Sequence, residues 1–305
     1  MRISTGQIWS NATSALMRAQ HAKDTATVQL TSGKIASDIG GYGQEAESLV
    51  SHQSALARLE GYQEVAKIVS ERLESQNTAL ERAGDGASDA KEAILKAIAS
   101  QSLEGLTTQL ESSYTAFVDG INYKHQGDYL FGGGNEAQSP LAASSLGELA
   151  SLPTGSLFRN GAVKKASTID QATTLQTGLL AGDIAKETVD VFKDIKTFID
   201  SNQPMTGKMS ETQRKTLQDL ANRMGKAYSG IVDKTALNGN MQNVVENSLS
   251  SLKAQSTTLT NIISTKTDVD KAEAYTKLQQ ADTSVKIAAE IVSNLKSSSL
   301  LDLLR

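Results

Sequence analysis

The sequence predicts a mainly α-helical protein, in which long antiparallel helices from both chain ends form coiled-coil and bundle layers, with a small mixed insertion domain containing β-strands in the middle. Its prolines, Pro140, Pro153 and Pro204, all lie between two long flanks that lack the residue most damaging to helix interiors. Apolar residues follow a heptad spacing at both chain ends. Aromatic residues make up only 4% of the chain, so small aliphatic side chains must fill the interior, which suits thin helical bundles.

The heptad at the C-terminal end alternates steps of four and three residues, which is the spacing of the a and d positions of a coiled coil. The N-terminal end repeats this alternation with alanines, and two leucines broaden its stripe. One such stripe is typical of any amphipathic helix that packs on its own core. Two stripes at opposite ends favour an assembly interface, which we predict to contain Ile8, Ala12, Ala15, Leu16, Ala19, Ala22, Ala26 and Leu30 together with Ala274, Leu278, Ala281, Val285, Ala288, Val292 and Leu295.

The C-terminal tail adds four leucines around one aspartate. Exposed to water, such a tail would form an apolar patch of the kind that usually marks an interaction site. We therefore include Leu300, Leu301, Leu303 and Leu304 in the predicted interface.

The N-terminal flank contains a predicted turn followed by a long helix. Four glycines between residues 33 and 43 interrupt the helical pattern. The heptad then runs from Leu59 to Ile94 with Gln76 as its one polar position. Gly84 and Gly86 predict a bend in this helix, because glycine lowers helix stability by up to about 1 kcal/mol relative to alanine.

Further helices are predicted over residues 106–124, 184–200, 210–233 and 240–264. A terminal helix should start near Asp268 or Asp270, whose carboxylate can cap its first turn.

The segment between the flanks predicts brief strands and turns. Asn160-Gly161 is a hairpin signal, and three glycines at 132–134 indicate a tight turn rather than a phosphate-binding loop, which would need a following lysine. The predicted domains are therefore residues 1–38 with 268–305 as a terminal coiled-coil assembly domain, 39–126 with 184–267 as a helical bundle, and 127–183 as an outer insertion.

Composition argues against several classes of function. The net charge is −4 with no basic run, so no nucleic acid partner is expected. There is no cysteine, no apolar run near the roughly 18 residues of a membrane span and no visible secretory signal. His21, His52 and His125 lack a ligand spacing, and no catalytic motif occurs. We expect no enzymatic activity, cofactor, metal or membrane.

Several segments, in their order along the chain, resemble the flagellin superfamily. Within it, MRIST and YLFGG are more similar to the hook-associated proteins of the hook–filament junction than to filament flagellin, whereas the LLDLLR ending is also similar to that of many flagellins. The match covers both flanks and leaves only the insertion unassigned. The segments are MRIST at the start, QLTSGKIASDIGGYGQEAESL, GDYLFGGGNEAQSP, ALNGNMQNVVENSLSSL and TDVDKAEAYTKLQQADTSVKIAAEIVSNLKSSSLLDLLR.

The resemblance implies a structural role at the hook–filament junction. Its expected partners are further copies of this chain, the first hook-associated protein, flagellin, and a cytoplasmic export chaperone on the C-terminal helix. It also implies export through the flagellar type III apparatus without a cleaved signal, and terminal helices that fold as they assemble. Filament flagellin remains the alternative. An adhesin, a signalling protein or an enzyme is disfavoured, because the sequence offers no membrane segment and no recognisable catalytic site.

Overall fold

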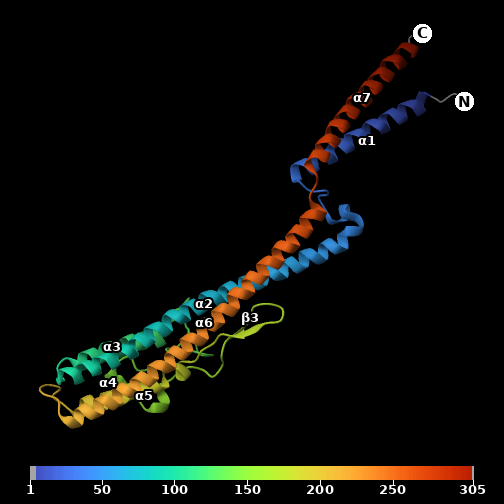
Figure 1. Ribbon diagram of the computed structural model, residues 1–305. Coiled ribbons are helices and arrows are strands. Elements are labelled where there is room, and N and C mark those ends of the chain that lie inside the picture. The colour runs from blue at the N-terminus through green and yellow to red at the C-terminus, as the bar shows by residue number, and fades with distance from the viewer. Residues whose placement is uncertain (1–4, 304–305) are drawn as a thin grey trace. The chain divides into compact units, whose positions relative to one another are not determined.

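The computed structural model describes the backbone of residues 5–303 and the side chains of residues 6–153 and 155–295. This part of the chain contains seven α-helices and two two-stranded antiparallel sheets (Figure 1). The predicted mainly α fold with a small strand-containing insertion is therefore confirmed.

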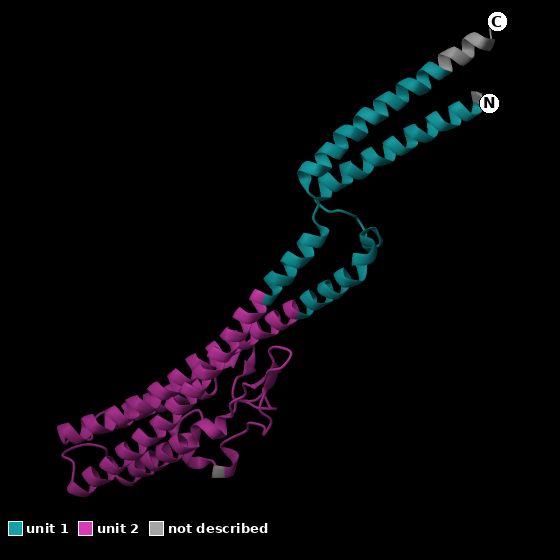
Figure 2. Ribbon diagram, turned by 45° about the vertical axis from the view of Figure 1, so that its right-hand side comes forward, with its two compact units in different colours: residues 1–58, 255–305 teal, residues 59–254 magenta. Residues whose placement is uncertain are grey.

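The chain divides into two compact units (Figure 2). Unit 1 comprises Met1–Arg58 and Gln255–Arg305, and unit 2 comprises Leu59–Ala254. Each unit brings together segments that are distant in sequence. The finer division into three domains stays a prediction.

Unit 1 contains the two terminal helices, α1 (Thr5–Ser32) and α7 (Lys271–Leu303), which lie side by side in antiparallel directions (Figure 1). Helix α1 ends at Ser32 and is followed by Gly33, whose φ of 70° is a left-handed conformation suited to glycine. Helix α7 begins after Asp270, whose Oδ1 accepts hydrogen bonds from the backbone N–H of Ala272 (2.8 Å) and Glu273 (3.2 Å). The predicted cap is confirmed at Asp270.

The predicted glycine turn is the segment between α1 and α2 in unit 1. It contains a 3₁₀ helix, Ile39–Glu45, whose N-cap Asp38 accepts a hydrogen bond from the backbone N–H of Gly41 at 2.9 Å. Two backbone hydrogen bonds join the segment after α1 to the segment where α6 ends and α7 begins. The N–H of Ile35 donates to the carbonyl of Thr267 (2.8 Å), and the N–H of Val269 donates to the carbonyl of Gly33 (3.0 Å).

Two long helices run through both units, and both differ from the sequence prediction. Helix α2 spans Ala46–Ser100, so it begins before the predicted Leu59. Helix α6 spans Glu211–Thr267 as one helix, and the predicted break between residues 233 and 240 is wrong. Asn238 lies at this break but is fully buried, and its Nδ2 donates to the carbonyl of Leu73 on α2 at 2.8 Å. Tertiary packing therefore overrides the weak helix propensity of this Asn-Gly-Asn segment.

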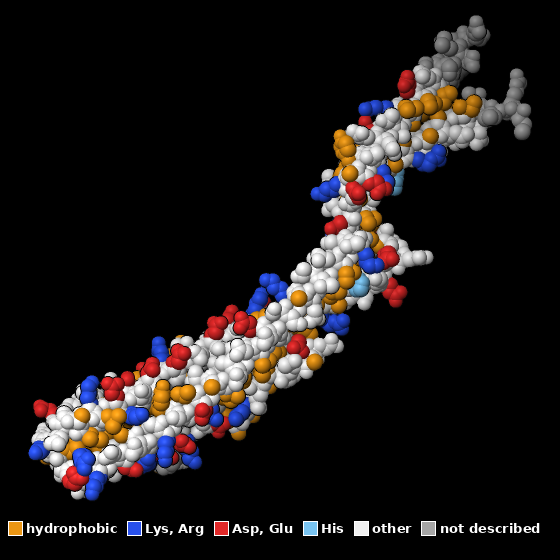
Figure 3. Space-filling view, viewed as in Figure 1, with side chains coloured by type: hydrophobic (Ala, Val, Ile, Leu, Met, Phe, Trp, Pro, Cys, Tyr) orange, Lys and Arg blue, Asp and Glu red, His pale blue; other side chains and the backbone are white. Residues whose placement is uncertain are grey.

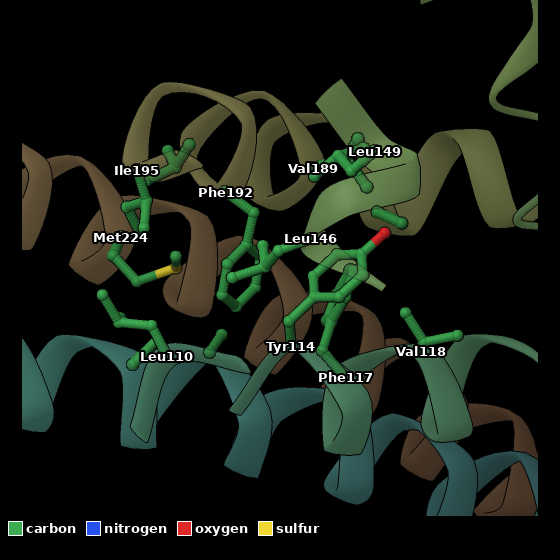
Figure 4. Packing of buried hydrophobic residues seen from close by; sticks show 14 of the residues in the cluster. Leu110, Tyr114, Phe117, Val118, Leu146, Leu149, Val189, Phe192, Ile195 and Met224 are labelled. Atoms are coloured by element: carbon green, nitrogen blue, oxygen red, sulfur yellow. The ribbon is translucent and has the colours of Figure 1, made fainter. Parts of the chain in front are cut away.

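Three shorter helices complete the bundle of unit 2. They are α3 (Leu106–Ile121), which ends before the predicted residue 124, α4 (Leu146–Ser151) and α5 (Ala181–Ser201). Their core is an aromatic cluster in which the Phe192 ring lies 5.0 Å from Tyr114 and 5.7 Å from Phe117, centroid to centroid (Figure 4). The Tyr114 hydroxyl donates to the Ala143 carbonyl at 3.0 Å, which satisfies the only polar atom of that side chain.

Helix α2 is continuous through Gly84 and Gly86, and at Gly86 the missing side chain serves helix packing. Gly86 and Gly120 sit where α2 and α3 cross. A Cβ atom on Gly86 would lie 2.5 Å from the backbone N of Phe117, and one on Gly120 would lie 2.4 Å from the backbone N of Ala83. Side chains of any size would force the two backbones apart.

The insertion packs on the bundle through short strands and loops. Strands β1 (Lys124–His125) and β2 (Asp128–Tyr129) form one hairpin, with positive φ at both turn residues, Gln126 and Gly127. Strands β3 (Ala166–Thr168) and β4 (Thr174–Gln176) form the other, and a second 3₁₀ helix spans Thr154–Ser156.

The turn signals of the insertion have mixed outcomes. The glycine turn at 132–134 is confirmed, with the backbone N–H of Asn135 bonded to the carbonyl of Gly132 at 3.1 Å. The hairpin predicted at Asn160-Gly161 is wrong. Instead the N–H of Gly161 donates to the same Gly132 carbonyl at 2.8 Å, and Asn160 Oδ1 accepts from the N–H of Gly182 at 3.2 Å. These long-range bonds hold the segment as a docked loop.

The one polar heptad position of α2, Gln76, makes a buried hydrogen bond to the insertion. Its side chain is fully buried, and Nε2 donates to the carbonyl of Thr177 at 3.2 Å, just after β4. The bond anchors the insertion to the helical bundle. A leucine there would leave that carbonyl without its side-chain partner.

Candidate assembly interface

The seven heptad residues of α7 all lie on its side facing α1. Ala274, Ala281 and Ala288 are buried, and the four larger residues between and after them are half-buried. On α1 Ala26 is buried, Ala12, Ala15, Leu16, Ala19 and Leu30 are half-buried, and Ile8 and Ala22 are exposed. The two predicted stripes are thus brought together within one chain. Their role in contacts between chains stays a prediction, as does that of Leu300, Leu301, Leu303 and Leu304, which lie outside the residues with described side chains.

A salt bridge crosses the seam between α1 and α7. Lys23 Nζ lies 2.7 Å from Asp282 Oδ1, and Lys286 Nζ lies 2.8 Å from Asp282 Oδ2 on the same helix. The hydrogen bond from Lys23, followed by that from Lys286, lowers the pKa of Asp282 to about 2. At the other end of the seam, Lys34 Nζ lies 2.5 Å from Asp268 Oδ1, and this hydrogen bond lowers the pKa of Asp268.

These shifts predict acid-induced loosening of the terminal helix pair. Because the folded-state pKa of Asp282 is below its ordinary value of 3.8, its contribution to stability is present above that pH and is lost as the pH falls towards 2. Spin labels on cysteines introduced at Val28 and Tyr275, both exposed, should report a longer α1–α7 distance across this range. Asp282→Asn should weaken the transition, and Asp24→Asn should not. An equal transition in all three proteins would contradict the assignment.

An open groove runs along one side of this seam, and we call it the alanine groove. Its first part has a volume of about 260 Å³ and is lined by alanines of α1, including Ala12 and Ala15, and by Ile287 and Ile291 of α7. Its second part, of about 460 Å³, shares Ala19 and Ser284 with the first and continues past Ala22 and Ala26. Small side chains on α1 leave this hollow, because two helices packed through alanine do not fill the space beside their line of contact.

Large apolar side chains outside the predicted stripes are exposed on the same helices. Met17 and Val28 on α1, and Tyr275, Ile287 and Ile291 on α7, are between 48% and 67% exposed. Figure 3 shows hydrophobic side chains along the terminal helices among sparse charged groups. These residues lie outside the single heptad pattern of each helix, so that pattern does not predict them. The signal for them in the sequence is the presence of large apolar residues on the other faces of the two helices.

The histidines and acidic side chains of the described residues were compared with the geometry of a metal site. They include no group of three or more histidine, cysteine or acidic side chains able to hold a metal. His21, His52 and His125 each lie beside a serine or threonine hydroxyl, the shortest contact being 2.8 Å from Ser75 Oγ to His125 Nδ1. Within residues 5–303, none of the helices combines the length and apolar character needed to cross a bilayer.

Solved structures with the same fold come from flagellar hook-associated proteins. A Vibrio parahaemolyticus protein described as a flagellar hook-associated protein superposes with a TM-score of 0.62 at 15% identity, over 72% of this chain and 96% of that one. FlgL of Bacillus cereus gives 0.58 at 17% identity, over 70% and 99% of the two chains. FlgL of Xanthomonas campestris gives 0.57 at 16%, also over 70% and 99%.

No protein-family model matches the sequence, and no curated protein sequence matches it. The likeness therefore lies in the fold. The chain has the fold of these flagellar hook-associated proteins, and they are matched along almost their whole length.

Proposed function

We propose that this chain is a structural component of the bacterial flagellum, a third hook-associated protein that joins the hook to the filament. The observation that carries the proposal is the fold shared with FlgL from two bacteria over 99% of each of those chains. The sequence segments that resemble the flagellin superfamily support it independently, since the structural comparison does not depend on them. In this role the protein has no enzymatic activity and takes no cofactor.

The proposed mechanism is mechanical. The α1–α7 pair supplies the contacts between subunits, and a ring of subunits sits between the first hook-associated protein and the filament, where it templates flagellin polymerisation. The insertion of residues 127–183 faces outward. A cytoplasmic chaperone covers the C-terminal helix before export through the flagellar type III apparatus. The exposed apolar side chains on α1 and α7 support both steps, because such surfaces usually mark interaction sites.

Filament flagellin is the second candidate, favoured by the LLDLLR ending. The two candidates differ in where and how abundantly the protein occurs. A junction protein forms a single layer, whereas flagellin fills the whole filament.

Localisation separates the two. An epitope tag placed after Val163, which is 69% exposed in the insertion, should label isolated flagella as one discrete spot between hook and filament. Labelling along the entire filament would identify the chain as flagellin. Absence of label from flagella, with the tagged protein present in the cells, would overturn both assignments. A strain carrying a tagged flagellin provides the control for filament labelling.

A further inference from the structure

We propose that Gln76, Thr177 and Asn238 form a buried site that binds one internal water molecule, at the point where α2, α6 and the insertion meet. Each of the three side chains is fully buried. Each also has one oxygen atom, Gln76 Oε1, Thr177 Oγ1 or Asn238 Oδ1, without a hydrogen-bond partner among the described residues. Buried polar atoms in proteins are nearly always hydrogen-bonded, either to protein or to ordered water. The inference concerns the folded chain itself and does not rest on the proposed function.

Two hydrogen bonds bring these three side chains together. Gln76 Nε2 donates to the carbonyl of Thr177 at 3.2 Å, so these two residues are in direct contact. Asn238 Nδ2 donates to the carbonyl of Leu73 at 2.8 Å. In an α-helix this carbonyl points along the axis towards the N–H of Asn77, and it therefore lies beside the base of the Gln76 side chain. The three side chains thus meet where three segments of the chain converge.

The two carbonyl groups determine which way each amide points. If either amide were turned over, its oxygen would face the carbonyl oxygen of Thr177 or Leu73, and neither atom could donate a hydrogen. The amide nitrogens therefore face these carbonyls, and Gln76 Oε1 and Asn238 Oδ1 point away from them as hydrogen-bond acceptors. The Thr177 hydroxyl can both donate and accept. The site thus offers two oriented acceptors and one hydroxyl whose hydrogen can turn.

One water molecule matches this set of groups. It can donate its two hydrogens to the amide oxygens of Gln76 and Asn238 and accept the hydrogen of the Thr177 hydroxyl. Buried waters typically make about three hydrogen bonds to groups that otherwise lack partners. A metal cation is a poorer match, because none of the three side chains carries a negative charge and an unpaired buried charge is far more costly than a buried neutral molecule.

Bulk solvent does not reach these oxygens, because apolar residues flank the site along both long helices. On α2, Leu73 and Ala79 on either side of Gln76 are fully buried. On α6, Met241 follows Asn238 by one turn and is 6% exposed. Ala79 belongs to the main hydrophobic core, whereas Leu73 and Met241 belong to a second cluster, so the polar site lies between the two. An ordered water is therefore the donor that can satisfy both amide oxygens.

Crystallography of the full-length protein, at a resolution that shows ordered waters, tests the site directly. We expect one water within hydrogen-bond distance of all three oxygens in the wild-type protein. The double variant Gln76→Met/Asn238→Leu should show none, because it keeps the sizes of the side chains and removes both acceptors. A wild-type site without water would overturn the proposal, as would a direct hydrogen bond from the Thr177 hydroxyl to either amide oxygen. Water that persists in the double variant would overturn the assignment of its partners.

A threonine-to-valine substitution gives a second test, which needs no crystal. Thr177→Val should lower the midpoint of thermal unfolding by about 5 °C, because the bound water loses one of its three partners and the methyl group replaces a bonded hydroxyl. Calorimetry on the full-length protein measures the shift.

Thr188→Val is the matched control. The Thr188 side chain is also fully buried, and its Oγ1 also has no hydrogen-bond partner among the described residues. Its neighbours on the same face of α5, Ala185 and Phe192, are apolar and fully buried, so no water site adjoins it along the helix. Valine there should leave the midpoint unchanged or raise it, because it removes an unpaired hydroxyl. If Thr177→Val behaves in the same way as Thr188→Val, the Thr177 hydroxyl binds no water and the proposal is overturned.

Discussion

Gly86→Ala and Gly120→Ala should each destabilise unit 2 by about 3 kcal/mol, at the upper end of the usual cost of overpacking. The reason is that the added methyl meets backbone atoms of the facing helix at 2.5 Å or less rather than the end of a flexible side chain. Relief requires α2 and α3 to move apart, which loosens the core around Phe117 and Phe192. The free energy of unfolding from urea titration, monitored by circular dichroism, measures the effect.

Gly61→Ala is the matched control. Gly61 lies in the same helix α2 and is exposed, and a Cβ atom added there would meet no packed neighbour within 4 Å. Alanine there should stabilise the protein by up to about 1 kcal/mol, because glycine loses more backbone entropy on folding. Equal effects at positions 61, 86 and 120 would show that helix propensity, and not close packing, governs all three.

Ala281→Glu should weaken assembly about a hundredfold while unit 2 remains folded. Ala281 is 7% exposed on the seam of α7 and borders the second part of the alanine groove with Ala22 and Ala26 of α1. A carboxylate there must either lose its hydration or separate α1 from α7. A loss of about 3 kcal/mol in the free energy of association raises the dissociation constant roughly a hundredfold. Analytical ultracentrifugation measures the association, and calorimetry checks that the bundle still unfolds cooperatively.

Thr283→Glu is the control for this prediction. Thr283 is exposed and follows Ala281 by two positions, so the same charge stands on the opposite side of α7. We expect this variant to assemble. If Ala281→Glu associates as strongly as the wild-type protein, the α1–α7 seam is not needed for contacts between subunits.

The helical fold could be predicted from sequence because periodic patterns reflect local geometry. The heptad of α7 and the cap at Asp270 correspond directly to backbone features of that helix. The continuity of α6 through Asn238 could not be predicted, because its cause is a hydrogen bond to Leu73, which is distant in sequence. The close packing at Gly86 could not be predicted either, because it depends on where α3 crosses α2.

The candidate interface was predictable in part for a similar reason. The stripes on α1 and α7 are periodic, so the sequence indicated that they face another helix. Their place at opposite ends of the chain, together with the family resemblance, also predicted that residues 8–30 and 274–295 form the two halves of one seam, and the α1–α7 pair has this arrangement. With the stripes paired in this way, large apolar side chains such as Met17, Val28, Ile287 and Ile291 stay exposed on the two helices.

The sequence by itself determined the helical class, the position of the insertion between two proline-free flanks, and the apolar stripes at both ends. Each follows from steric rules and side-chain periodicity along one segment. Only the tertiary structure decided that α6 continues through Asn238, that Gln76 anchors the insertion at Thr177, and that an alanine groove remains open beside Ile287. Those features depend on which distant segments meet and on how closely small side chains let them approach.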